Sequence, residues 1–175
     1  MGMCLHSGTG VEQDPFEAVD WFRKAADQGH LGAMYNMGAC YSNGHGVGRD
    51  YSAAISYYQQ AAQQDHALAQ YQLGVFYYKG KGIGKDFKIA MQWFKKASDN
   101  HCERAWYYIG LMHEKGLGVY PSDSTASKWY GKVLEKGRSH PDYAKAHSGY
   151  QRVMSLREKT ARMFRKWAGK NTATN

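Results

Sequence analysis

The stretch that decides the fold is residues 33–62, which read AMYNMGACYSNGHGVGRDYSAAISYYQQAA. Its first part spaces three residues four apart, as on one stripe of a helix: Ala33, Met37 and Tyr41. Gly44 and Gly46 then end the pattern, because glycine accepts the left-handed backbone conformation found at many helix C-termini. Asp50 is a suitable N-cap for a second helix. The stretch therefore predicts a helix, a glycine turn and a second helix.

This unit recurs with a period of 36 residues, without gaps, over four units. The first turn glycine recurs as Gly8, Gly44, Gly80 and Gly116. Two columns of the second helix are alanine and aromatic: Ala18, Ala54, Ala90 and Ala126, then Trp21, Tyr57, Trp93 and Trp129. No strand-like alternation of useful length appears. A fixed period of this length predicts an all-α repeat protein.

Composition limits the class of protein. The 175 residues are 43% apolar and 22% charged, which is too apolar for a disordered chain. No run approaches the ~20 apolar residues that cross a bilayer, and three cysteines do not make a disulfide framework. The first 30 residues also lack the apolar run of a signal peptide. We therefore expect a reduced, cytoplasmic protein, while a secretory or organellar compartment stays open if the chain is a fragment.

The residues resemble a known family. In the third unit the pattern comprises Ala69, Leu73, Gly74, Tyr77, Gly80, Gly82, Ile83, Asp86, Ala90, Trp93, Phe94, Ala97 and Ser98. It is similar to the Sel1-like repeat, a relative of the tetratricopeptide repeat, over residues 1–137. The resemblance implies an all-α, right-handed α-solenoid of antiparallel helix pairs. The sequence departs from the family pattern at three places. Leu5 and His113 stand where the pattern has tyrosine, and Val133 and Leu134 stand where it has alanine. Ser122 stands where the pattern has the helix-starting aspartate, a role that Asp123 could fill with a shift of one residue.

Both ends depart from the regular array. Met1 aligns with Met37, so the first helix is truncated, and we expect self-association through this open N-terminal repeat. Residues 138–142 break the register as a linker, residues 143–170 predict a C-terminal helical cap, and residues 171–175 a frayed tail. The apolar face of the cap is expected from Val153, Leu156, Ala161, Phe164 and Trp167.

The glycine-rich turn of the third unit does not form a phosphate-binding loop. Lys79 stands where the P-loop pattern needs its first glycine, and Asp86 follows Lys85 where it needs serine or threonine. One repeat column contains His30, His66 and Cys102, but equivalent positions in stacked helices lie ~10 Å apart, too far to share a zinc ion.

A second column contains two cysteines and indicates a packing position, because its members are Cys4, Cys40, Phe76 and Met112. No nucleophile stands beside a recognisable base. We expect no catalytic residue, no metal site and no cofactor.

The family resemblance also implies a binding surface, because the first helices of such pairs line a concave groove. The residues opposite the buried stripe of each first helix would form its wall: Tyr35, Asn36, Tyr71, Gln72, Val75, Tyr78, Lys79, Tyr107, Tyr108, Leu111 and Lys115. Tyrosine suits partner surfaces because it combines contact area with a hydroxyl group. Packing between repeats is the alternative for Tyr35, Tyr71 and Tyr107, whereas Tyr78 and Tyr108 stand in otherwise polar columns.

Most of the net charge of +8 falls within residues 151–175, and the rest of the chain is near neutral. A possible secondary basic patch comprises Arg157, Arg162, Arg165 and Lys166. It is interpreted as the solvated face of the cap, as a docking site for an acidic or calmodulin-like partner, or as a membrane or nucleic-acid patch. Because the rest of the chain is near neutral, we do not expect nucleic acid as the partner. No prenylation or myristoylation motif is present, so we do not expect a membrane partner either.

The resemblance implies a non-enzymatic scaffold or adaptor that binds a peptide or protein partner in the concave groove. Two other functions are alternatives to the scaffold. One is a homotypic assembly module that pairs through the open N-terminal repeat, and the other is an accessory regulatory subunit of an enzyme complex.

Overall fold

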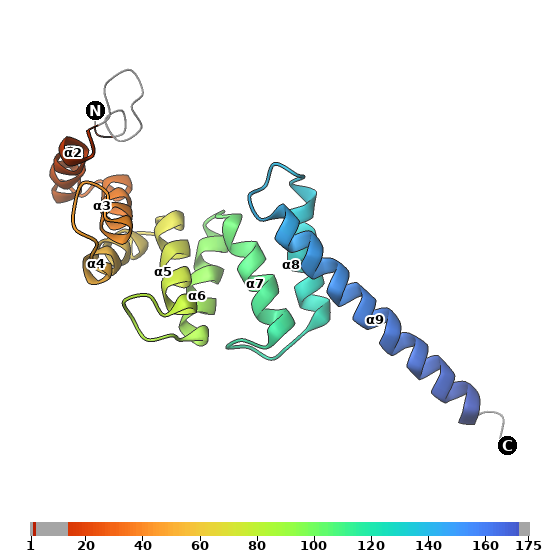
Figure 1. The fold of residues 1–175 in the computed structure, drawn as a ribbon. Coiled ribbons are helices and arrows are strands. Elements are labelled where there is room, and N and C mark those ends of the chain that lie inside the picture. The colour runs from red at the N-terminus through yellow and green to blue at the C-terminus, as the bar shows by residue number, and fades with distance from the viewer. Residues whose placement is uncertain (1, 3–13, 172–175) are drawn as a thin grey trace. The chain divides into compact units, whose positions relative to one another are not determined.

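The computed structural model describes Gly2 and residues 14–171, with the backbone only for Phe164 and residues 166–171. The chain divides into two compact parts, Met1–Cys102 and Glu103–Asn175. From here on, unit 1 and unit 2 mean these two parts and not the 36-residue repeats. Every regular element of the described residues is an α-helix, as the sequence predicts (Figure 1). The expectations for Met1, Cys4, Leu5, Gly8 and residues 172–175 fall outside the described part.

In the described part of each unit, consecutive helices pack on one another (Figure 1). The helices of unit 1 are α2 (Pro15–Asp27), α3 (Leu31–Asn43), α4 (Tyr51–Ala62), α5 (Ala67–Lys79) and α6 (Phe87–Asp99). Those of unit 2 are α7 (Arg104–Lys115), α8 (Asp123–Glu135) and α9 (Tyr143–Asn171), and α9 packs on both of the others. Contact between sequence neighbours is the arrangement that a repeat array requires.

The helix starts and turns follow the sequence signals. Carboxylates that accept hydrogen bonds from backbone N–H groups of the first turn cap α2, α4 and α6: Asp14, Asp50 and Asp86. The first helix of each described pair ends at a left-handed glycine: Gly44, Gly80 and Gly116. At α8 the hydroxyl of Ser122 accepts from the N–H of Thr125 at 3.2 Å. Ser122 is therefore the cap, and Asp123 is the first residue of the helix.

Small residues bring the paired helices together around buried aromatic rings. A Cβ atom on Gly74 would lie only 2.7 Å from the ring of Phe94, and one on Gly110 would lie 2.9 Å from the ring of Tyr130. Both rings are fully buried. The glycine column thus sets the distance between the helices, and the aromatic column fills the space between them.

Among the described side chains of the C-terminal helix, the buried ones lie in its first half. Ala146 and Val153 are fully buried, whereas Leu156 is 52% exposed and Ala161 is also exposed. The prediction of a buried apolar face that includes Leu156 and Ala161 is therefore wrong. The reason is length, because α9 has 29 residues and α8 has 13, so α9 runs past the helix on which it packs (Figure 1). The predicted contributions of the Phe164 and Trp167 side chains fall outside the described part.

None of the described helices combines the length and the apolar character that are needed to cross a bilayer.

Candidate functional site

The predicted groove residues of unit 1 lie on α3 and α5, the first helices of two successive pairs. We call six of them the tyrosine surface: Tyr35, Asn36, Tyr71, Gln72, Tyr78 and Lys79. Lys79 is exposed, and the other five are partly buried. The ring of Tyr35 lies 5.3 Å from the ring of His66, which caps the start of α5. This contact places the ring of Tyr35 beside the N-terminus of α5.

Tyr35 and Tyr71, the fifth residues of α3 and α5, are held by contacts within the chain. The ring centroid of Tyr35 lies 5.8 Å from that of Tyr58 in α4, and that of Tyr71 lies 6.0 Å from that of Phe94 in α6. Tyr58 and Phe94 are buried, whereas Tyr35 and Tyr71 keep part of their surface accessible. Each ring therefore packs on a neighbour within the chain, as the packing alternative predicts, and also keeps part of its surface accessible.

Other predicted groove residues differ in how much surface they offer. Val75 and Leu111 are only 9% and 8% exposed, because they lie beside the buried stripes of α5 and α7. They contribute to packing, and we leave them out of the candidate surface. Tyr78 is partly accessible and packs edge-on against Phe87 at 5.5 Å, and burial raises the pKa of its hydroxyl.

In unit 2 the predicted residues lie on α7. The ring of Tyr107 lies 6.1 Å from that of the buried Tyr130 and 5.4 Å from that of Tyr108, while Lys115 is exposed at the end of the helix. Unit 2 thus repeats the chemistry of the tyrosine surface, namely partly accessible tyrosines and a lysine in the last helical turn. Trp106 is partly buried and lies against the core of this unit.

A buried amide network beside the tyrosine surface was not predicted from the sequence. Gln70 is fully buried, and its side-chain amide donates to the carbonyl of Ala62 and to the carboxylate of Asp65, both at 3.1 Å. Asn100 donates to the side-chain oxygen of Gln70 at 2.9 Å. The network ties α5 to the ends of α4 and α6. Its only sequence signal is a polar residue in a column that otherwise contains Met34 and Trp106.

A charged cluster joins the three helices of unit 2. The carboxylate of Glu114 in α7 accepts hydrogen bonds from the hydroxyl of Tyr130 in α8 at 2.5 Å and from Nε of Arg152 in α9 at 2.9 Å. The Glu114 side chain is 12% exposed. Burial raises the pKa of Glu114, but the hydrogen bonds from Arg152 and Tyr130 outweigh it, so its pKa lies below the ordinary value.

We expect Glu114→Gln to lower the free energy of unfolding of the chain by about 2 kcal/mol at neutral pH, because it removes a charge-assisted acceptor from the buried hydroxyl of Tyr130 and from the exposed guanidinium of Arg152. A depressed folded-state pKa contributes stability above the unfolded-state pKa, and this stability is lost as the pH falls through the folded-state pKa. Urea unfolding at a series of pH values should therefore show the gap between wild type and variant closing in acid. A gap that stays constant down to the pH of general acid unfolding would contradict this role.

His66 predicts a second pH dependence, in unit 1. Its Nδ1 accepts a hydrogen bond from the N–H of Ala69 at 3.2 Å, and burial lowers the pKa of the ring. The stabilisation that neutral His66 provides is therefore complete above its unfolded-state pKa of about 6.5. This stabilisation is lost as the pH falls through the lower folded-state pKa. The expected loss is about 1 kcal/mol, the usual contribution of an N-cap.

The variant His66→Asn keeps a cap acceptor without a titrating ring, so thermal melts of this variant should lose that part of the pH dependence. His30→Asn is the matched control, because His30 occupies the same repeat position and its side chain makes no capping hydrogen bond. Equal pH dependence in wild type and in His66→Asn would refute the assignment.

The histidines, the cysteines and the basic patch form no common site within the described part. Within the described residues, no three His, Cys, Asp or Glu side chains come together as metal ligands would. Cys40 is buried, and burial raises the pKa of its thiol, which disfavours the reactive thiolate. On α9, three members of the predicted basic patch are exposed, Arg157, Arg162 and Arg165, while the Lys166 side chain falls outside the described part.

Paired helices of fixed period, glycine-mediated close contacts and a partly open tyrosine surface define a helical-repeat protein. The family model described as Sel1 repeat matches residues 1–30, 32–66, 67–102 and 104–137. The chain therefore belongs to the Sel1 repeat family. A search of curated proteins gave no match.

Solved structures support this assignment. A Sel1 repeat protein from Oxalobacter formigenes is 32% identical, with a TM-score of 0.79 over 89% of this chain and 61% of that one. The protein c5321 of uropathogenic Escherichia coli, described as a protective antigen with an SLR fold, is 29% identical, with a TM-score of 0.71 over 89% of this chain and 37% of that one. The present chain thus spans about three fifths or less of these two relatives.

Cysteine rich protein B of Helicobacter pylori shares the fold at 22% identity, with a TM-score of 0.55 over 75% of this chain and 95% of that one.

Proposed function

We propose that the chain is a non-catalytic scaffold whose tyrosine surface binds a peptide or protein partner. The observation that supports this most strongly is the pair Tyr35 and Tyr71, which are partly accessible rings fixed against the buried rings of Tyr58 and Phe94. A ring that is already fixed loses little conformational entropy when a partner packs on it, so more of the contact energy becomes affinity. Tyrosine is also enriched at binding hot spots.

The polar members of the surface indicate the kind of partner. Asn36 and Gln72 occupy the same repeat position on α3 and α5, and side-chain amides can both donate to and accept from the backbone of a bound peptide. Lys79 adds an exposed positive charge at the end of α5. We therefore propose a partner segment that presents free backbone groups and an acidic residue near Lys79.

The same surface would serve an accessory subunit of an enzyme complex, in which the bound partner is the enzyme. We place this role in a reducing compartment such as the cytoplasm, because Cys40 is a free thiol in a buried packing position.

The proposal is tested by affinity capture from lysate with the variant Gln72→Glu/Lys79→Glu, which changes the charge of the surface and removes no ring. We expect this variant to lose a partner that the unchanged chain retains, with at least a tenfold drop in captured amount, equivalent to about 1.4 kcal/mol. Each protein is first checked for unchanged helicity and melting temperature.

The matched control is Gln92→Glu/Lys95→Glu, which makes the same changes at exposed positions of α6. It should capture the partner as the unchanged chain does. If both double variants lose the partner equally, net charge rather than the tyrosine surface determines binding, and if neither loses it, the partner binds elsewhere.

A further inference from the structure

Two successive glycine turns of unit 1 carry a group of exposed basic side chains. The first turn joins α3 to α4 and contains Arg49, and the second joins α5 to α6 and contains Lys81 and Lys85. Lys88 follows in the first turn of α6. We call these four residues the basic edge: Arg49, Lys81, Lys85 and Lys88. All four are exposed.

The ring of Tyr51 joins the two turns. The second turn lies directly on Tyr51, the first residue of α4, because a Cβ atom on Gly82 would overlap Cβ of Tyr51. The guanidinium of Arg49 lies 5.8 Å from the centroid of the Tyr51 ring, and Nζ of Lys81 lies 5.6 Å from it. The ring itself packs edge-on against the buried Phe76 at 5.9 Å. One fixed ring thus holds a cation from each turn, so the two turns present their charges together.

The cations of the basic edge are not neutralised by ion pairs. Other basic side chains of the described part pair with carboxylates, as Arg23 does with Asp20 at 2.8 Å. Among the described residues, no carboxylate lies at salt-bridge distance from any of the four edge cations. The acids of the two turns are Asp50 and Asp86, and both carboxylates accept hydrogen bonds from backbone N–H groups at the starts of α4 and α6. The edge cations are therefore available to an anionic partner.

The basic edge continues the tyrosine surface. Lys79, the last residue of α5 and a member of that surface, is separated from Lys81 by Gly80 alone. A segment that leaves the tyrosine surface at the C-terminal end of α5 therefore meets the edge next. The corresponding turn of unit 2, residues 116–122, contains no lysine or arginine. The concentration of positive charge is thus particular to unit 1 and not common to every turn of the array.

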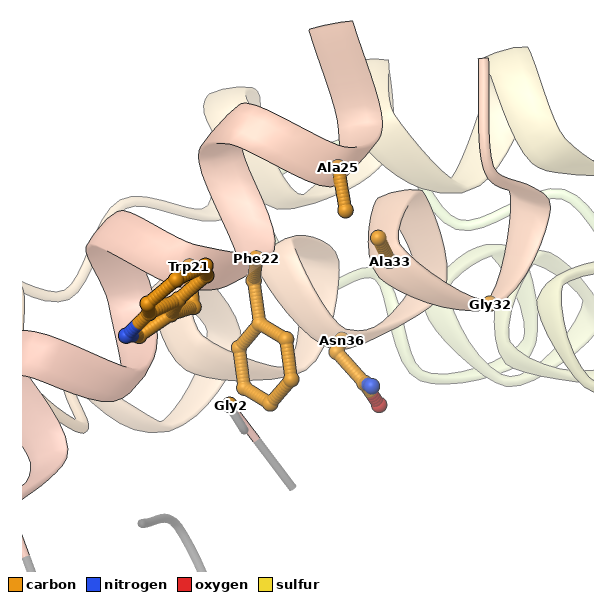
Figure 2. Close-up of a pocket in the computed structure, with 7 residues that line it drawn as sticks. All are labelled: Gly2, Trp21, Phe22, Ala25, Gly32, Ala33 and Asn36. Atoms are coloured by element: carbon orange, nitrogen blue, oxygen red, sulfur yellow. The ribbon is translucent and has the colours of Figure 1, made fainter. Parts of the chain in front are cut away.

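The pocket between α2 and α3 does not suit an acidic segment. The described residues that line it are Gly2, Trp21, Phe22, Ala25, Gly32, Ala33 and Asn36 (Figure 2). None of these residues carries a positive charge, so the pocket does not attract a carboxylate. Between these two features of unit 1, the basic edge is the one that suits an acidic partner.

We propose that the basic edge binds an acidic segment of the protein partner whose neighbouring residues lie on the tyrosine surface. Carboxylates of this segment pair with the four edge cations, and the attraction weakens as the salt concentration rises. This inference rests on the proposed function, because it names the chemistry of the partner that the tyrosine surface binds.

The distribution of charge favours an acidic protein segment over a nucleic acid. Residues 1–102 contain nine basic and nine acidic residues, so this unit has no net charge apart from its histidines. A nucleic acid carries a negative charge at every nucleotide and is bound through an extended positive surface. A short acidic segment needs only the two turns of the basic edge.

The edge is tested with a probe of known chemistry, a short fluorescein-labelled poly-glutamate peptide. The probe is titrated with the full chain and followed by fluorescence anisotropy. The variant Lys81→Glu/Lys88→Glu should weaken binding by about tenfold or more, because like charges then face each other. Binding by the unchanged chain should also weaken as salt is added.

The matched control is Lys95→Glu/Lys96→Glu, which makes the same charge change at exposed positions of α6. Each pair contains one lysine over an aromatic ring, since Nζ of Lys96 lies 4.9 Å from the ring centroid of Trp93. The control should bind the probe as the unchanged chain does. Every variant is first checked for unchanged helicity and melting temperature.

A second arm asks whether the edge and the tyrosine surface bind one partner. Lys81→Glu/Lys88→Glu should capture about tenfold less of the lysate partner that the unchanged chain retains, and the control pair should capture it normally. Excess poly-glutamate should release the captured partner. Capture that is unchanged in Lys81→Glu/Lys88→Glu would overturn the inference and leave the proposed function intact.

The probe experiment has further outcomes that overturn the inference. They are no binding by the unchanged chain, an equal loss in both double variants, and tighter binding of a single-stranded RNA of equal charge. The two proposals fail separately, because the proposed function fails when the changes at Gln72 and Lys79 leave capture intact. The inference fails when binding of poly-glutamate does not depend on the basic edge.

Discussion

Replacing Gly46 by alanine is expected to lower the free energy of unfolding by about 2–5 kcal/mol. Gly46 lies in the turn between α3 and α4 with a φ of 69°, a conformation that a Cβ atom disfavours. That Cβ would also overlap the backbone carbonyl of Pro15 in α2 and lie 3.0 Å from Cγ2 of Val19. Backbone strain and overpacking therefore act together at the contact between two repeats.

Gly48→Ala is the control, because it lies in the same turn and a Cβ there would meet nothing within 4 Å. Gly48→Ala should change the free energy of unfolding by no more than about 0.5 kcal/mol. Urea unfolding followed by circular dichroism measures the free energy of unfolding of both variants. Equal stability of the two variants would mean that the turn does not lie against α2 as described.

Phe94→Ala is expected to lower the free energy of unfolding by about 3–5 kcal/mol, because it leaves a cavity at the centre of the contact between α5 and α6. The Phe94 ring is fully buried, lies against Tyr71 and fills the space beside Gly74. The loss also removes the support of Tyr71, so we expect weaker capture of the partner even where the variant is folded. Unfolding curves and capture should change together.

Phe16→Ala makes the same chemical change at a ring that is 71% exposed in α2, and its effect on unfolding should be within about 0.5 kcal/mol. The milder Phe94→Leu keeps most of the side-chain volume. It therefore separates the effect on capture of losing the ring that holds Tyr71 from the effect of lower folding stability. If Phe94→Ala unfolds no more easily than Phe16→Ala, the assignment of the repeat core to this column is wrong.

The period of 36 residues predicts most of this fold, because it carries both the helix stripes and their stop signals. The turn at Gly80 and the close contact of Gly74 with Phe94 are readable from single columns, since only glycine suits either position. Ser122 was ambiguous because serine and the aspartate beside it both make good caps, and only the hydrogen bond to Thr125 separates them.

Side-chain accessibility was harder to predict than helix position. Val75 and Leu111 fall on the outward side of an ideal helical wheel, yet both are buried in the structure. Leu156 fits the apolar pattern of a cap but lies beyond the end of the helix that would cover it. The network of Gln70 depends on a side chain from 30 residues away, which no local pattern reveals.

The central claim, that the tyrosine surface binds the partner, is tested most directly by site-specific photocrosslinking. A photoreactive phenylalanine analogue at Gln72 lies on the surface, and one at Gln92 lies at an exposed position of α6 in the same unit. We expect the Gln72 probe to yield a discrete crosslinked species in lysate, which Lys79→Glu weakens, and the Gln92 probe to yield none. A crosslink from Gln92 alone, or equal crosslinks from both positions, would contradict the claim.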